Sequence, residues 1–444
     1  MDVKVAELNK DVMQAVEALN YRVTVGDVAA QSGLKVEVAQ QGLLALASET
    51  QGHMQVSEEG EIAYEFSKNF RGVLRNKYWQ LRFQETLSKI WQVVFYLIRV
   101  SFGIMLLVSM VIIAIAIFAL FIAMSSQGGN NRDDRRGGGM SFGFSPFNLF
   151  YLFDFNYGRG RRRYPNQSSN SRGRVARTAD SGEKLQFLEA IFSFLFGDGD
   201  PNADLEERRW QAIGAVIANS GGAIAAEQVV PYLDELGEGW EKEYEDYMIP
   251  VLSRFNGQPE VSPTGDMVYY FPELQVSAAQ RQKSSVSAYL KEFKRKFTQA
   301  TSDQVMLSIG LGSANMIGAL VLQNMLQSAL AQGVVLPGAA LFAQSILGLL
   351  MGYGAAFLLI PLGRYFWVQR QNAKIEARND ARAERATMLN RLSESFQAKL
   401  AFAKQFANQK VLRQESAVYT TETDLFEQEE ESVEAEFMRK LNEI

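Results

Sequence analysis

The sequence predicts a mainly α-helical membrane protein with α+β soluble parts: two winged-helix modules, a helical transmembrane hairpin and a long C-terminal helix. Three observations support this fold class: two long apolar blocks, a repeated pattern of helices followed by a β-hairpin, and a long helical period near the C-terminus. The chain has 444 residues and a net charge of −5, a length that accommodates several modules. The predicted segments are residues 1–75 (winged-helix module 1), 76–124 (linker helix and first membrane segment), 125–182 (Gly/Arg-rich linker with an aromatic patch), 183–203 (amphipathic helix and acidic turn), 204–273 (winged-helix module 2), 274–304 (stalk helix), 305–363 (transmembrane helical hairpin), 364–420 (stalk helix) and 421–444 (acidic tail).

The first module is predicted from its helical spacing and its turn residues. Apolar residues recur at helical intervals over residues 8–19. Thr24 is placed to open a short second helix that ends at Gly33, and a third helix follows over residues 36–48. Residues 53–66 then alternate on both sides of Glu59-Gly60, which is typical of two antiparallel strands. Three helices followed by a hairpin are the winged-helix order.

The second module repeats this pattern. Residues 55–66 and 260–271 align without gaps, and Val, Ser, Gly, Tyr and Phe recur at the same positions. The upstream segments 14–18 and 211–215 also match, so the sequence indicates an internal duplication. The third helix of the second copy is expected at residues 239–249.

The third helices carry too few cations for DNA binding, which needs Lys or Arg at the phosphates. The first offers only Lys35, and the second has four acidic residues against Lys242. We therefore expect no nucleic-acid partner and a protein-docking use of both modules. Tyrosine is enriched at protein interfaces, and the predicted docking face of the second module contains Tyr244, Tyr247, Tyr269 and Tyr270.

Both apolar blocks are long enough to cross a bilayer. Residues 102–124 are 23 residues without a charge. Residues 305–331 and 338–363 predict a helical hairpin with its turn at Gln332, Gly333 and Pro337. Basic residues flank both ends of this hairpin, so the second module and the C-terminus are expected on the cytoplasmic or stromal side. Residues 90–124 either span once or bend near Gly103 or Ser109 into a shallow hairpin. The sequence leaves the side of the first module open.

Small residues in the hairpin indicate close helix packing, either within this chain or between copies of it in a homo-oligomer. The predicted contact residues are Ala314, Gly318, Gly348, Gly352 and Gly354. Amide side chains on the first arm are expected to make interhelical hydrogen bonds or, alternatively, to line a polar path: Asn315, Gln323, Asn324 and Gln327.

Residues 125–178 contain ten Arg, three Asp and no Lys, in a Gly-, Ser- and Asn-rich context typical of disorder. An aromatic stretch within them is followed by an arginine cluster, a combination that suits contact with anionic lipid headgroups. Packing on a protein subunit and RNA stacking are the alternatives. The lipid-contact residues are predicted to be Phe142, Phe144, Phe147, Phe150, Arg159, Arg161, Arg162 and Arg163.

The acidic turn after residue 196 resembles the start of a calcium loop. Asp198, Asp200, Asn202 and Asp204 have the spacing of an EF-hand, but Arg209 stands where the bidentate Glu belongs. A calcium site is therefore a weak prediction, and capping of the next helix explains the same residues.

Two stripes of apolar residues flank the hairpin. Val286, Leu290, Phe293 and Phe297 precede it, and a similar stripe occupies residues 389–406. These predict two stalk helices that bury each other. Residues 422–436 carry eight acidic residues and no basic one, which predicts an exposed tail or partner hook.

The segments Phe192-Ser-Phe-Leu-Phe-Gly-Asp-Gly-Asp-Pro-Asn202 and Glu206-Glu-Arg-Arg-Trp210, with Ser145-Pro-Phe and Gly265-Asp-Met-Val-Tyr-Tyr-Phe-Pro272, resemble a family of uncharacterised membrane proteins of cyanobacteria and plastid envelopes. The resemblance covers most of residues 90–300. It implies a thylakoid or plasma membrane location. Plant members have been labelled iron–sulfur cluster biosynthesis proteins, but a chain without Cys cannot ligate such a cluster in the usual way.

The sequence contains no Cys and one His, His53, and no phosphate loop or nucleophile elbow. We therefore expect no enzyme activity, no cofactor and no metal beyond the weak calcium candidate. The expected function is a membrane-anchored scaffold or assembly factor that docks subunits of a membrane complex and contacts anionic lipid. A transporter or channel component and a membrane-tethered transcription regulator are the alternatives.

Overall fold

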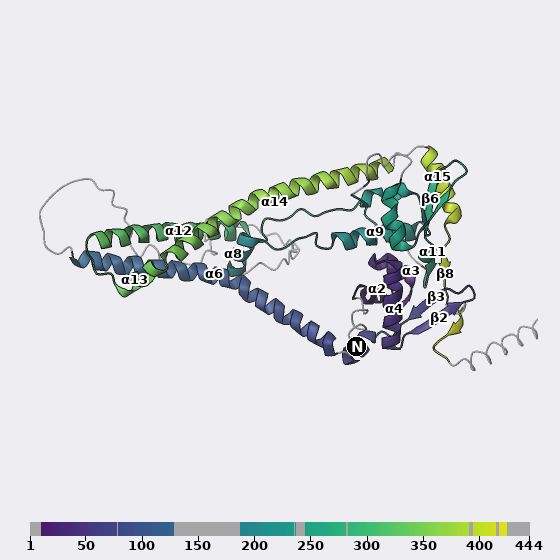
Figure 1. The fold of residues 1–444 in the computed structure, drawn as a ribbon, viewed down its shortest axis with the longest axis horizontal. Helices are drawn as coiled ribbons and strands as arrows, with labels where there is room; N and C mark the ends of the chain where they lie inside the picture. The colour runs from purple at the N-terminus through teal and green to yellow at the C-terminus, as the bar shows by residue number, and fades with distance from the viewer. Residues whose placement is uncertain are drawn as a thin grey trace, which may run out of the picture. The chain divides into compact units, whose positions relative to one another are not determined.

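The computed structural model describes residues 10–77, 79–127, 187–234, 236, 245–280, 283–389, 394–413 and 417–423. The protein is mostly helical and has small sheets (Figure 1). It forms two compact units. The first contains Met1–Lys89, Asp200–Arg295 and Gln371–Ile444, and the second contains Ile90–Gly199 and Lys296–Arg370.

The first module has the three helices and the β-hairpin that its sequence predicts. Its elements are α2 (Lys10–Ala18), β1 (Arg22–Thr24), α3 (Val25–Ser32), α4 (Val36–Thr50), β2 (His53–Ser57), β3 (Ile62–Glu65) and the following α5 (Phe70–Lys77). Thr24 caps α3, because its hydroxyl accepts from the N–H of Asp27 at 3.1 Å. Gly33 ends α3 with a φ of 71°, and Gly60 forms the hairpin turn with a φ of 84°. Local capping and turn residues therefore determine these boundaries.

The second module follows the same order, with a longer first helix and mostly shorter elements after it. They are α9 (Leu205–Asn219), β4 (Ala223–Ile224), η1 (Ala226–Gln228), η2 (Val230–Tyr232), η3 (Asp246–Met248), α10 (Ile249–Phe255), β5 (Gln258–Val261) and β6 (Met267–Tyr270). The strand orders correspond, β1-β3-β2 in the first module and β4-β6-β5 in the second. Most of the helix expected at residues 239–249 lies outside the described residues, and α10 begins only at Ile249.

The two modules share one hydrophobic core. Their helices α3 and α9 approach closely because position 214 is glycine. A Cβ at Gly214 would lie 2.9 Å from the Cα of Ala30, closer than atoms normally pack. The second module continues into α11 (Pro272–Gln275) and β7 (Val276–Ser277).

The stalk helix predicted for residues 274–304 is wrong. Only α11 is helical among the described residues between 274 and 301; β7 is a strand, and the others are in neither a helix nor a strand. They take an extended course because side chains from other elements bind the backbone groups that a helix would pair internally. The single long helix predicted for residues 364–420 is also incorrect. It is replaced by α14 (Leu347–Leu389), α15 (Glu394–Phe406), β8 (Lys410–Val411) and β9 (Ala417–Thr420).

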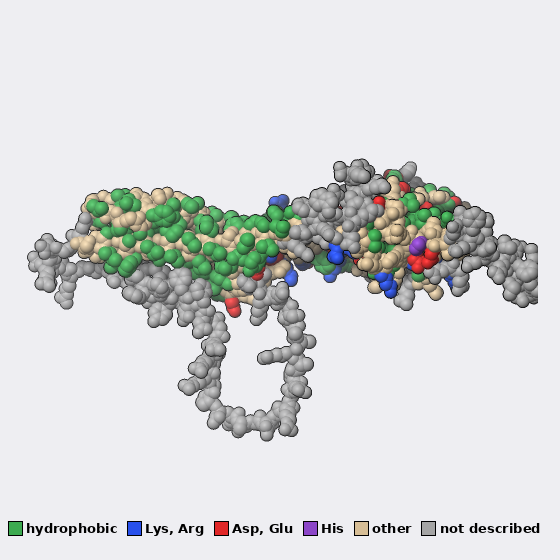
Figure 2. Space-filling model, turned by 90° about the horizontal axis from the view of Figure 1, so that it is seen from below, with side chains coloured by type: hydrophobic (Ala, Val, Ile, Leu, Met, Phe, Trp, Pro, Cys, Tyr) green, Lys and Arg blue, Asp and Glu red, His purple; other side chains and the backbone are tan. Residues whose placement is uncertain are grey.

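The second unit is a helical bundle of α6 (Trp79–Gln127) from Ile90 onward, α8 (Phe187–Phe196), α12 (Ser302–Ala331), α13 (Gly338–Ser345) and the first part of α14. Three described helices are long and apolar enough to cross a membrane: α6 over Ile90–Ser126, α12 and α14. Figure 2 shows hydrophobic side chains covering most of the visible face of this bundle. The predicted turn lies between α12 and α13, and Ile346 separates α13 from α14.

The alternative of a shallow hairpin at residues 90–124 is wrong, because α6 is one continuous helix. Gly103 does not bend it; this glycine lies against Leu188 of α8. Ser109 donates to the side-chain oxygen of Asn315 on α12 at 2.7 Å. Both predicted bend points are therefore packing positions.

Candidate functional site

Four asparagine side chains hold an extended segment of the first unit, residues 284–295, which we call the strap. Each amide donates to the carbonyl of one strap residue and accepts from the N–H of the same residue, at 2.7 to 2.9 Å. The pairs are Asn202 with Phe293, Asn219 with Ser284, Asn372 with Arg295, and Asn379 with Glu292. Because both contacts are to the main chain, this recognition depends little on the strap's side chains.

Further donors bind other strap carbonyls. Tyr232 donates to the carbonyl of Ser287 at 2.6 Å, and burial raises the pKa of its hydroxyl to about 12. Arg382 donates to the carbonyl of Leu290 at 2.9 Å, and the Leu290 side chain is buried. The strap is thus bound as an extended peptide and anchored by one apolar residue.

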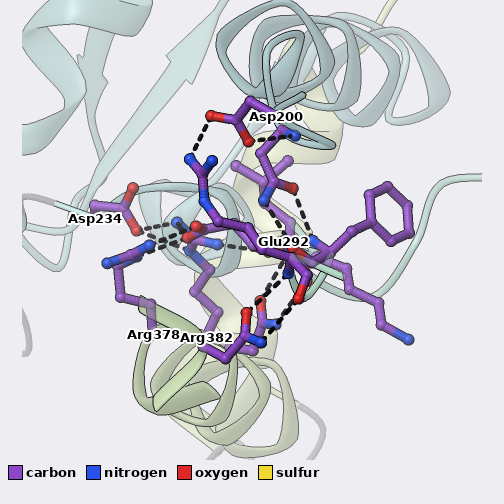
Figure 3. A network of polar contacts seen from close by, with 12 residues as sticks. Asp200, Asp234, Glu292, Arg378 and Arg382 are labelled. Carbon is purple, nitrogen blue, oxygen red and sulfur yellow. Dashed lines mark hydrogen bonds and ion pairs between the residues drawn. The ribbon is translucent and has the colours of Figure 1, made fainter. Parts of the chain in front are cut away.

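An ionic network joins the strap residue Glu292 to other parts of the first unit. Figure 3 shows its side chains pointing toward one another: Glu292, Asp234, Arg378 and Arg382. Arg382, only 1% exposed, binds Asp234 at 2.7 Å and Glu292 at 2.9 Å. Arg378 adds a second guanidinium to Glu292, with an N–O distance of 2.7 Å. Burial would raise the pKa of Glu292, but the hydrogen bonds from Arg378 and the charge of Arg382 outweigh it and lower the pKa. Every carboxylate here is neutralised, so the network has a structural role and no free acid or base.

We expect Asn379→Leu to release the strap locally, because it removes two hydrogen bonds worth about 1 kcal/mol each. Hydrogen exchange of the strap amides in detergent is the measurement, and protection should fall at Glu292. Asn219→Leu is the matched control, and in this variant the loss of protection from exchange should appear at Ser284. If protection fell evenly along the whole strap in both variants, the result would contradict the view that each asparagine holds the strap at its own position.

The predicted calcium residues do not form a common site. Asp198 accepts from Ser193 and from the N–H of Gln299, and Asn202 holds the strap. Asp200 pairs with Arg295, and Asp204 pairs with Arg208. Within the described residues no group of acidic side chains is arranged for a metal ion. The calcium prediction is therefore wrong, because cationic and backbone partners use these oxygens.

The predicted tyrosine docking face is covered by α15 of the same chain. Tyr247 and Tyr269 are buried within the chain, so they present no free surface in this structure. Tyr270 stacks on Phe406 of α15 with ring centroids 5.8 Å apart. Tyr244 lies outside the described residues. The sequence located an interaction surface here, but it could not show that the chain's own helix occupies it.

Lys399 of α15 enters a buried acidic pocket on this face. Its ammonium donates to Glu227 at 2.9 Å and to Glu245 at 2.7 Å. Burial would lower the pKa of Lys399, but the hydrogen bonds and charges of Glu245 and Glu227 raise it overall. Tyr247 and Tyr269 line the pocket, and burial beside the carboxylates raises the pKa of both hydroxyls. The pocket therefore selects a cation and keeps its tyrosines protonated.

The first module also binds a segment from the C-terminal part of the chain. Strand β9 pairs antiparallel with β2 and extends the hairpin sheet by one strand. The N–H of Met54 donates to the Thr421 hydroxyl at 2.8 Å. This contact is strand addition, a common mode of peptide recognition.

A groove of about 450 Å³ opens between the two modules. Amide and cationic side chains line much of it, among them Asn20, Gln31, Asn219, Gln280 and Lys283. Arg22 lies there too, but it already donates to the carbonyl of Leu412 at 2.7 Å and to Gln55 at 2.9 Å. Asp27 is engaged with Thr24 and Ser277. This groove presents polar surface without a free acid–base pair.

The exposed face of α4 combines two apolar side chains with polar ones and carries little charge. Val38 is 37% exposed and Leu44 is 45% exposed. Glu37, Gln40 and Gln41 lie beside them, and Lys35 precedes the helix. Such a face lacks the cations that phosphate groups require.

The small residues of the membrane helices differ in their neighbours. Gly318 lies against Ile113 of α6, and Gly354 lies against Met316 of α12. Ala314 packs beside the α8 end of the bundle. In contrast, a Cβ at Gly348 or Gly352 would have no neighbour within 4 Å among the described residues beyond the adjacent residues and backbone of its own helix. Three of the five predicted packing residues thus make helix contacts within this chain.

The amide side chains of α12 do not gather into a polar path. Asn315 is buried, and its amide nitrogen has no hydrogen-bond partner among the described residues. Asn324 and Gln327 are exposed on the outside of the bundle. The predicted lipid-contact residues between Phe142 and Arg163 lie outside the described residues.

The sequence is similar to that of an uncharacterised chloroplastic protein of Arabidopsis thaliana. The two are 38% identical over 445 residues, which cover 96% of this chain and 81% of the plant protein. No family model and no solved structure matches the chain. This similarity supports the expected plastid relationship, whereas the iron–sulfur label finds no support in it.

Proposed function

The chain belongs to the same family as this chloroplastic plant protein, and from that premise we propose that it is a non-enzymatic, membrane-anchored scaffold or assembly factor. Its three apolar helices are compatible with a plastid-type membrane. The proposed location is a cyanobacterial thylakoid or plasma membrane, with the plastid envelope as the counterpart in plants. Its proposed partners are subunits of a membrane complex.

The observation that carries this proposal is that both modules bind polypeptide beside their hairpins. The second module holds α15 through Lys399, and the first module holds β9 along β2. We infer that both are winged-helix modules arising from a duplication, and the shared order of helices and strands supports this. Their use is proposed to be protein docking.

The exposed face of α4 is the proposed site for a partner subunit. In a DNA-binding winged helix the corresponding helix presents cations to phosphate groups. Here it presents Val38 and Leu44 among neutral and acidic side chains. Exposed apolar residues with few charges favour a protein partner.

Both modules are proposed to lie on the cytoplasmic or stromal face of the membrane. They share a core within one compact unit, so they belong on the same side. Basic residues on both flanks of the α12–α14 hairpin favour the cytoplasmic or stromal side for that unit. This assignment places the turn at residues 332–337 on the opposite face.

Gentle detergent extraction of a C-terminally tagged chain, followed by a native gel and mass spectrometry, tests the proposed function. We expect membrane subunits to co-purify in stoichiometric amounts. Leu44→Glu should reduce their recovery about tenfold, since a buried interfacial charge costs 2 kcal/mol or more. Gln40→Glu, on the same helix, is the charge-matched control.

A homo-oligomer with nothing attached would contradict the scaffold proposal. It would favour a transporter or channel component, for which the buried amide nitrogen of Asn315, without a hydrogen-bond partner among the described residues, is the supporting observation. Salt-sensitive DNA binding by the purified chain would instead favour a transcription regulator. The exposed face of α4 disfavours that outcome.

A further inference from the structure

Helix α15 is seated on the second module as a ligand helix is seated in a groove. Its inward residues recur at intervals of three and four, the spacing of helix-in-groove recognition. They are Phe396, Lys399, Leu400, Ala403 and Phe406. Gln275 of the module donates to the carbonyl of Phe406 at 2.7 Å and caps the helix end. The aromatic residues Phe396 and Phe406 thus lie near the two ends of α15, and the cation of Lys399 lies between them.

The pocket around Lys399 has more acceptors than this lysine satisfies. One oxygen of Glu227 and the hydroxyl of Tyr247 are buried and have no hydrogen-bond partner among the described residues, whereas Glu245 interacts with the Tyr269 hydroxyl as well as with Lys399. Tyr247 is only 6% exposed. Two carboxylates facing one ammonium leave the pocket with an excess negative charge. The module thus provides a site for a lysine whether or not α15 fills it.

The contact between α15 and the module is expected to be selective for a lysine but to contribute little net binding free energy. Buried ion pairs select their partner strongly but add little net stability, because both charges lose water. Unpaired buried oxygens lower the stability further. With 13 residues, α15 is also near the length at which an isolated helix is marginal in water, so it gains little from its own hydrogen bonds.

We propose that the β4–β6 face of the second module is an exchangeable docking site for a lysine-bearing amphipathic helix of a partner protein, which α15 occupies in its absence. This inference rests on the proposed docking function and names the partner's chemistry. The partner helix has the pattern of α15: an aromatic residue, a lysine three residues later and a second aromatic seven residues after the lysine. Binding of such a helix displaces α15 from Tyr270, Glu227 and Glu245.

A labelled peptide with the sequence of residues 394–406 tests the proposal on the full chain in detergent. The receptor is the Lys399→Glu variant, whose own α15 is repelled by Glu227 and Glu245. We expect fluorescence anisotropy to show saturable peptide binding to this variant. A peptide with methionine in place of the lysine should bind at least about tenfold more weakly, because it leaves both carboxylates unpaired.

The wild-type chain should bind the peptide far more weakly, since its tethered α15 competes at an effective concentration near the millimolar range. Lys404→Glu changes an exposed lysine of the same helix and is the matched control, which should behave as wild type. Lys399→Gln removes the charge without repulsion and serves as receptor if Lys399→Glu does not fold. Equal binding of the lysine and methionine peptides, or no binding to either receptor, would overturn the proposal. Because this assay contains no partner protein, its failure would leave the co-purification test of the scaffold function unaffected.

Discussion

Replacing Arg382 by methionine is expected to lower the free energy of unfolding of the first unit by about 3 kcal/mol, the lower end of the cost of breaking a buried ion pair. The side chains of Arg382 and Glu292 are 1% and 4% exposed. Among the described ion pairs, the substitution leaves Glu292 paired with Arg378 and Asp234 paired with Arg209. It also removes the donor to the carbonyl of Leu290 in the strap. Chemical denaturation in detergent, followed by tryptophan fluorescence, is the measurement.

The matched control is Lys294→Met, which breaks an ion pair with Glu376 whose side chains are 56% and 57% exposed. We expect a change of about 0.5 kcal/mol or less, as for exposed pairs in general. The double variant Arg382→Met/Glu292→Met should be less destabilised than the sum of its single variants, because both single variants lose the same Arg382–Glu292 ion pair and the double variant loses it only once. Equal effects of Arg382→Met and Lys294→Met would contradict a stabilising role for the network.

Single cysteines at Glu58 and Thr264 are expected to react with a membrane-impermeant maleimide from the same face of sealed vesicles. A cysteine at Gln332 should react only from the opposite face. The reason is that the two modules share one core, whereas residues 332–337 form the turn of the proposed transmembrane hairpin. The effect is nearly all-or-none, and the chain's lack of cysteine makes the background low.

Permeabilised vesicles provide the control for this experiment, because all three cysteines should then be labelled. The three positions are exposed, so burial does not limit the reaction. Labelling of Glu58→Cys and Thr264→Cys from opposite faces would contradict both the shared core and the proposed sidedness. Labelling of Gln332→Cys together with the modules would contradict the transmembrane assignment of α12 and α14.

Elements defined by local interactions could be predicted well. Thr24 and Gly33 delimit α3 because a cap and a left-handed residue act within one turn of the helix. The alternation around Gly60 predicted the β2–β3 hairpin for the same reason. The apolar blocks likewise indicated the helices α6, α12 and α14 from length and composition.

The strap shows where such reasoning fails. Val286, Leu290 and Phe293 have helical spacing, yet the segment is extended in the structure. Its N–H and C=O groups pair with Asn202, Asn219, Asn372 and Asn379, which lie 65 to 91 positions away along the chain. No local pattern marks these asparagines as backbone-binding residues. Asn219, Asn372 and Asn379 lie in helices, where their polar character was the one signal available, and Asn202 lies in a turn.

The candidate docking face was predicted in part. Tyrosines near the second hairpin indicated an interaction surface, and Tyr270 does contact another helix. The occupant was missed, because Lys399 and Glu245 are 154 positions apart and no sequence pattern pairs them. The acidic turn was misread as a calcium candidate for a similar reason, since its partners, such as Arg295, lie far along the chain.

The sequence by itself determined the module order, the helix caps and hairpin turns, and the three apolar helices, because each depends on neighbouring residues or on composition. The tertiary structure alone decided the extended course of the strap, the position of α15 on the second module and the burial of Arg382. In all three, backbone groups or charges that leave water must find partners, and those partners come from elements distant in the chain. That distance is why the binding surfaces of this protein became visible only in the folded chain.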